Sequence, residues 1–92
     1  MHRREYNRFI VNASAVLDGK SSLMVQDLSV RGAGIIGSFP IKADNPVEIT
    51  ISRCFATKAP ISRKARVAWC KQLDNRLWQA GLDFGLSQEL AF

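Results

Sequence analysis

The sequence predicts an all-β fold, and three observations support this prediction. Apolar and polar residues alternate in several short runs, which is the period of a half-buried strand. Turn signals such as Asp18-Gly19 and Asp74-Asn75 separate these runs. The chain has 92 residues, 47% of them hydrophobic, which is enough for one core. We therefore expect residues 1–8 to form an arm before a single domain over residues 9–92, built as a small antiparallel sandwich or barrel of six strands.

The first two expected strands form a hairpin. From Phe9 the sequence alternates, and the apolar parity holds Phe9, Val11, Ala13, Ala15 and Leu17. Asp18-Gly19 follows and suits a tight primed turn, because both residues adopt positive φ at low cost. The second strand then runs back from Ser22 to about Gln26.

A regular continuation of the second strand raises a conflict at Asp27. Asp27 has the same parity as Leu23 and Val25, so its carboxylate would point toward the core. A buried unpaired carboxylate is costly. Either the strand bulges near Gln26, or Asp27 lies at the rim of a barrel. Both alternatives place Asp27 and Ser29 at an edge.

The other four expected strands are short and follow in order. Their ranges are about 35–39, 47–51, 61–70 and 77–84. Trp69 and Trp78 fall on the apolar parity of the last two strands, so we expect both in the core. Ser87 is a candidate cap for a last turn of helix.

The charge balance and the lack of catalytic patterns favour a binding protein over an enzyme. Thirteen Lys and Arg against eight Asp and Glu give a formal net charge of +5, which attracts anionic partners. Cys54 and Cys70 have no neighbouring Cys or His at metal-ligand spacing. Ser29 has no histidine partner except the terminal His2. We therefore expect no catalysis, no metal and no cofactor.

The distribution of apolar residues predicts a cytoplasmic protein. No apolar run approaches the roughly 20 residues that a transmembrane helix needs. The N-terminal residues are charged and lead into no signal-peptide hydrophobic core. We therefore expect no transmembrane segment and no export.

Two groups of polar residues predict a site for a phosphorylated purine. Arg4 and Arg8 are four residues apart and share a face in a helix or a strand. An arginine engages a phosphate bidentately, pairs with the O6 and N7 edge of guanine, or stacks on the base. Asp27 only accepts hydrogen bonds, so it suits the N1–H and N2–H edge of guanine or an arginine, while Ser29 donates or accepts. Gly32 lets the backbone come close to a ligand.

These residues resemble the motifs of the PilZ domain family. Arg4-Glu5-Tyr6-Asn7-Arg8 resembles its RxxxR motif, and Asp27-Leu28-Ser29-Val30-Arg31-Gly32 resembles its (D/N)xSxxG motif. Residues 47–51, 65–69 and 81–84 resemble later strands of the family, so the resemblance covers nearly the whole chain. It implies a six-stranded antiparallel split β-barrel, here with at most a short C-terminal helical turn. It also implies a bacterial cytoplasmic receptor for the second messenger cyclic di-GMP.

The resemblance further assigns residues to this ligand. The residues that it implies are Arg3, Arg4, Arg8, Asp27, Ser29 and Gly32. The arginines of the RxxxR motif would bind phosphate and guanine, and the second motif would contact the other side of the ligand. Arg3 lies at a position where the family varies, and an arginine there favours an intercalated ligand dimer. We expect the arm to close over the nucleotide at the barrel rim and to change a surface that a downstream protein binds.

Two alternatives stay open beside this hypothesis. The first is a PilZ-like adaptor that binds a protein and no nucleotide, as family members with degraded motifs do. The second is a basic barrel for single-stranded nucleic acid, in which Trp69, Trp78 or Tyr6 stacks on bases. Both motifs are intact and both tryptophans are expected in the core, so we favour cyclic di-GMP and expect no specific nucleic acid partner.

Overall fold

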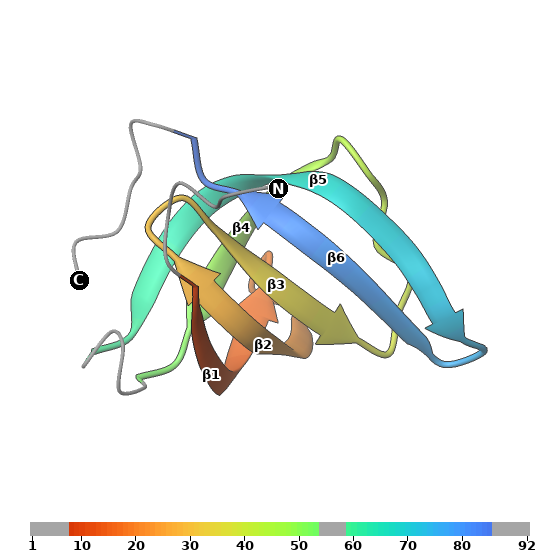
Figure 1. Ribbon diagram of the computed structural model, residues 1–92, viewed down its shortest axis with the longest axis horizontal. Coiled ribbons are helices and arrows are strands. Elements are labelled where there is room, and N and C mark those ends of the chain that lie inside the picture. Colours follow the sequence, from red (N-terminus) through yellow and green to blue (C-terminus); the bar gives the residue numbers. More distant parts are fainter. Residues whose placement is uncertain (1–7, 54–58, 86–92) are drawn as a thin grey trace, which may run out of the picture.

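Six antiparallel strands close into a barrel in the computed structural model, which describes residues 8–53 and 59–85 (Figure 1). The strands are β1 (Phe9–Leu17), β2 (Ser21–Ser29), β3 (Gly32–Gly37), β4 (Pro46–Ile51), β5 (Ile61–Asp74) and β6 (Leu77–Asp83). They follow one another around the barrel in the order β1-β2-β3-β6-β5-β4. This confirms the all-β, antiparallel fold. The helical turn expected at Ser87, together with Arg3 and Arg4, lies outside the described residues.

The β1–β2 turn confirms the predicted hairpin and also helps to close the barrel. Asp18 and Gly19 both have positive φ, 54° and 69°. Asp18 is tied to β4, because its backbone N–H donates to the Glu48 carbonyl and its Oδ1 accepts from the Glu48 N–H. Paired residues between β1 and β4 cover only Ala15–Leu17 of β1. The barrel is therefore joined along a short seam, as the term split barrel describes.

A β-bulge in β2 resolves the conflict at Asp27. The register with β3 shifts between Val25 and Asp27, which leaves Gln26 as the extra residue. The bulge reverses the alternation, so that Leu28 is fully buried while the Asp27 side chain keeps 29% of its surface exposed. Of the two alternatives for Asp27, the bulge near Gln26 is confirmed. The predicted end of the strand near Gln26 is wrong, because β2 continues to Ser29.

A second bulge lies in β5. The register with β6 shifts between Val67 and Trp69, so Ala68 is the extra residue. Val67 is fully buried, but Trp69 turns to the outer surface and is 46% exposed. The expectation that Trp69 belongs to the core is wrong, because counting every second residue fails across a bulge. Trp78 does pack against the core, and β5 runs on to Asp74, past the expected end of the strand.

The core fills the inside of the barrel with apolar residues from all six strands. Its fully buried large side chains are Phe84, Leu28, Ile35, Ile49, Ile51, Val25 and Val67. β3 begins at Gly32, earlier than expected, and Phe39 packs against the core from beyond the strand's end. No helix in the described ranges is long and apolar enough to cross a membrane.

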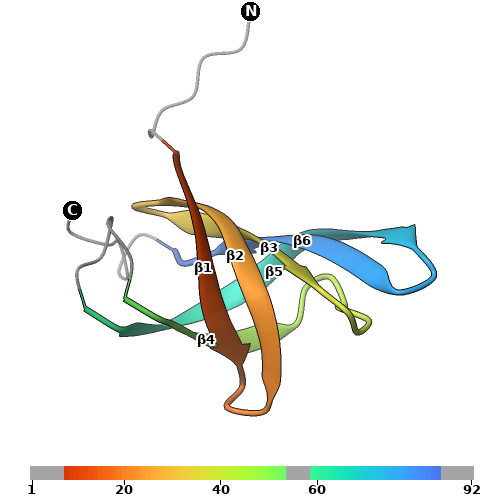
Figure 2. The same cartoon turned by 90° about the horizontal axis from the view of Figure 1, so that it is seen from below.

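The β5–β6 hairpin projects away from the rest of the barrel, as the side view shows (Figure 2). Its tip carries exposed apolar side chains, Leu73 at 44% and Leu77 at 38%. Gln72 and Arg76 near the turn both bond to Asp74, through a side-chain amide and a backbone N–H. Figures 1 and 2 both show this tip far from the end of the sheet where β1 begins and β2 ends.

Candidate functional site

An ion pair between Arg8 and Asp27 joins the two motifs that the sequence singled out. Arg8 directly precedes β1, and Phe9 pairs with Leu28 of β2, so the hairpin brings the end of the arm beside the second motif. Arg8 Nη1 donates to Asp27 Oδ1. The two side chains keep 38% and 29% of their surfaces exposed. The structure therefore places one residue of each motif in direct contact at the barrel surface.

The Asp27 carboxylate reaches over the neighbouring strand. Asp27 pairs with Gly34 of β3. A Cβ at position 34 would lie 2.9 Å from Oδ2 and 3.0 Å from Oδ1 of Asp27, so the carboxylate would have to shift to make room for it. Gly34 therefore leaves the space that the carboxylate occupies.

The other two residues of the second motif shape the β2–β3 turn. Ser29 is only 5% exposed, and its hydroxyl donates to the Gly32 carbonyl and accepts from the Arg31 N–H, both at 3.4 Å. A Cβ at Gly32 would lie 2.3 Å from the carbonyl oxygen of Leu82. The close approach that Gly32 permits is thus to the backbone of β6. Ligand contact by Ser29 and Gly32 stays a prediction.

The side chain of Trp69 lies over Gly81, as the side chain of Asp27 lies over Gly34. A Cβ at Gly81 would lie 2.2 Å from the indole Nε1 of Trp69. Gly81 pairs with Trp69 on one side and with Gly34 on the other. The signal that could have pointed to Trp69 is the pair of glycines inside strands, since such glycines mark a close approach by another group. Sequence reasoning missed this, because the parity of Trp69 suited a core residue.

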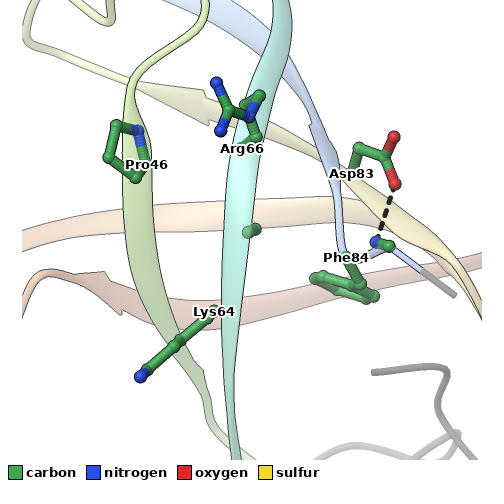
Figure 3. Close-up of a pocket in the computed structure, with 7 residues that line it drawn as sticks. Pro46, Lys64, Arg66, Asp83 and Phe84 are labelled. Atoms are coloured by element: carbon green, nitrogen blue, oxygen red, sulfur yellow. Dashed lines mark hydrogen bonds between the residues drawn. The ribbon is translucent and has the colours of Figure 1, made fainter. Parts of the chain in front are cut away.

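A shallow hollow of about 280 Å³ lies beside the end of β6 (Figure 3). It is lined by Pro46, Lys64, Ala65, Arg66, Asp83, Phe84 and Gly85. Figure 3 shows Lys64 and Arg66 pointing in different directions, so their charges do not converge on one anion. Arg66 donates to the Asp44 carbonyl at 3.4 Å, and the Asp83 carboxylate accepts from the Gly85 N–H at 2.8 Å. None of the described residues that the motifs nominated lines this hollow, and we do not place the site there.

The described part of the chain offers no evident place for a metal ion. Within residues 8–53 and 59–85, no three His, Cys, Asp or Glu side chains gather closely enough to hold one. Cys70 is a free, half-buried thiol that packs against the core, and Cys54 lies outside the described residues.

Comparison with protein families agrees with the motifs and the fold. The PilZ domain family matches residues 2–91, nearly the whole chain. This chain belongs to the PilZ domain family. The match includes both motifs, and the ring of six antiparallel strands is a PilZ-type barrel. PilZ domains are cyclic di-GMP receptors and adaptors that act through partner proteins. A search of curated proteins finds no match to this chain.

Proposed function

We propose that this PilZ domain is a cytoplasmic receptor module that binds cyclic di-GMP on the outer surface of the barrel, beside Asp27. In this proposal the arm over residues 1–8 closes on the nucleotide and changes a surface that a downstream protein recognises. The observation that carries the proposal is the contact of Arg8 with Asp27. It brings the last residue of the RxxxR motif to the first residue of the (D/N)xSxxG motif, which lies 19 positions further along the chain.

The chemistry of the ligand complements both members of this ion pair. A guanine base offers N1–H and N2–H donors, which an acceptor-only carboxylate such as Asp27 can bind. A phosphate of the ligand carries negative charge and accepts from a guanidinium such as Arg8. The ligand can thus replace each partner of the ion pair with a group of matching chemistry. Arg3 and Arg4 supply further cationic contacts in this proposal, and Arg3 favours an intercalated ligand dimer.

The energies favour such an exchange. An ion pair with both side chains partly exposed contributes only about 0.2–1 kcal/mol, because water screens the charges. A charge-assisted hydrogen bond to a ligand is worth about 1.5–3 kcal/mol. Breaking the Arg8–Asp27 pair therefore costs less free energy than the new contacts with the ligand contribute. The cost of ordering the arm lowers the net affinity, and it also couples binding to a change of surface.

Titration calorimetry with cyclic di-GMP tests this proposal. Arg8→Ala and Arg4→Ala should each weaken binding by about tenfold or more, because each removes a charge-assisted contact. Arg76→Ala is the matched control. It removes the same charge from an exposed position in the β5–β6 turn and should leave the affinity unchanged. Equal affinity of wild type, Arg4→Ala and Arg8→Ala would reject the site.

The same titration separates the proposal from the adaptor alternative. A protein with a folded β-sheet spectrum that takes up no cyclic di-GMP at high ligand concentration would be a nucleotide-independent adaptor.

One observation supports the nucleic acid alternative and another opposes it. The exposed Trp69 indole is available for stacking on a base, contrary to expectation. Asp27, however, lies three strands away in the same register row, with β3 and β6 in between, and its negative charge opposes a phosphate backbone. We therefore expect any gel shift with single-stranded DNA to disappear at moderate salt, as nonspecific charge attraction does.

A further inference from the structure

Gln26, the extra residue of the β2 bulge, lies at an irregular point of the sheet on both of its sides. Toward β3, Val25 and Asp27 pair with consecutive residues, so Gln26 stands between two pairs. Toward β1, two residues, Val11 and Asn12, lie opposite Gln26. The regular pairing that fixes a strand in a sheet is therefore interrupted at the residue directly before Asp27.

The side chain of Gln26 is bound by Gln79 of β6. Gln79 Nε2 donates a hydrogen bond to Gln26 Oε1 at 3.0 Å, and both residues are half-buried. β3 lies between β2 and β6, so this bond joins two strands that are not neighbours in the barrel. Two strand spacings amount to roughly 10 Å, a distance that two extended glutamine side chains can span together. The bond therefore ties the bulge to a distant strand.

This bond bears on Asp27 because the bulge turns two adjacent side chains outward. Val25 and Leu28 are both fully buried, so Gln26 and Asp27 between them point to the outer surface. The Asp27 carboxylate fills the space over Gly34, where its Oδ2 lies 2.9 Å from the position of a Cβ. A second side chain in that space would displace it. The bond to β6 draws Gln26 away and leaves the space to Asp27.

We propose that Gln79 is a positioning residue for the nucleotide site, which binds Gln26 and so keeps the Asp27 carboxylate in place for the ligand. The inference rests on the proposed function and adds a residue that lies outside both motifs and far from them in sequence. Gln79 acts through Gln26 and not on the ligand. A neutral amide suits this role, because it binds Gln26 without adding a charge beside the Arg8–Asp27 pair.

Calorimetric titration of the full chain with cyclic di-GMP tests this inference. Gln79→Ala should weaken binding about three- to tenfold, the loss expected when one neutral hydrogen bond no longer favours the binding arrangement. In a Gln26→Ala background the same change should have no effect on affinity, because the group that Gln79 holds is gone. An effect that came from general destabilisation of the fold would persist in that background.

Gln72→Ala is the matched control. It removes the same side chain and one amide hydrogen bond, to the Asp74 carbonyl at 2.9 Å, but near the hairpin tip. It should bind like wild type. In ¹⁵N–¹H spectra of the ligand-free proteins, the Asp27 amide should shift in Gln79→Ala and stay in place in Gln72→Ala.

The outcomes separate this inference from the proposed function. If wild type binds and Gln79→Ala binds equally well, or is weakened by the same factor with and without Gln26, the positioning role is overturned and the proposed function stands. An unmoved Asp27 amide in Gln79→Ala overturns the role as well. If wild type does not bind at all, the proposed function fails and the inference fails with it. Circular dichroism checks that each variant is folded.

Discussion

Two bulged strands, β2 and β5, border the same pair of glycines from opposite sides. In β2 the bulge moves Asp27 out of the core, and in β5 it moves Trp69 out of the core. The first left a trace in the sequence, because regular alternation would have buried a carboxylate at high cost. The second left no such conflict, because regular alternation would have buried a tryptophan, which is an acceptable core residue. Alternation therefore reveals a bulge only when a regular strand would bury a residue that is unsuitable for the core.

The glycines on β3 and β6 differ in the group that lies over each of them. Gly34 and Gly81 leave room for side chains, whereas Gly32 leaves room for the backbone of β6. Side chains can move aside when a methyl group is added, but a paired backbone strand cannot move without disturbing its neighbours. We therefore expect substitution by alanine to lower the free energy of unfolding more at Gly32 than at Gly34 or Gly81.

The largest expected effect is on stability, at Gly32. A Cβ there would lie 2.3 Å from the carbonyl oxygen of Leu82, so Gly32→Ala must push β3 and β6 apart. We expect the free energy of unfolding to fall by about 3 kcal/mol, the upper end for overpacking. Urea denaturation measures this. A loss below about 0.5 kcal/mol would contradict the backbone role of Gly32.

A smaller effect is expected at Gly81. Gly81→Ala should lift the Trp69 indole from the sheet, since the new Cβ would overlap the ring. We expect a loss of about 1 kcal/mol in stability, because the exposed ring can move into solvent. The ligand-free emission spectrum should change as the indole moves. An unchanged spectrum would mean that Gly81 does not set the position of the indole.

The smallest effect is expected for the Arg8–Asp27 pair in the absence of ligand. A double-mutant cycle with Arg8→Ala and Asp27→Ala should give a coupling energy of about 0.2–1 kcal/mol, reduced by added salt. Unfolding at low and high salt measures it. A coupling above about 2 kcal/mol that salt does not change would show that the pair stabilises the fold and is not readily released to a ligand.

Much of the fold was predictable because alternation and turn chemistry act locally. The strand at Pro46–Ile51 and the positive φ at Asp18 and Gly19 follow from residues that are close in sequence. The predicted strand bounds are wrong where a bulge shifts the alternation, or where a strand extends beyond its run of alternating apolar residues. β2 and β5 both continue past their bulges, and β3 begins at a glycine instead of at its first isoleucine.

The candidate site was predictable only in part. The meeting of Arg8 with Asp27 follows from the order of two motifs around a hairpin. The burial of Ser29 in its own turn does not, since a serine at a strand end serves equally as a turn residue or a ligand contact. The position of Trp69 depends on cross-strand pairing with Gly81, which residues distant in sequence determine.

We propose that the nucleotide binds the outer surface of the barrel beside Asp27, where Arg8 and Gly34 adjoin it. An ¹⁵N–¹H correlation spectrum recorded during titration with cyclic di-GMP tests this placement. We expect shifts in the amides of Arg8, Asp27 and Gly34, with the hairpin tip near Arg76 unchanged. Shifts confined to the hollow around Arg66 and Phe84, with Asp27 and Gly34 unmoved, would reject the placement.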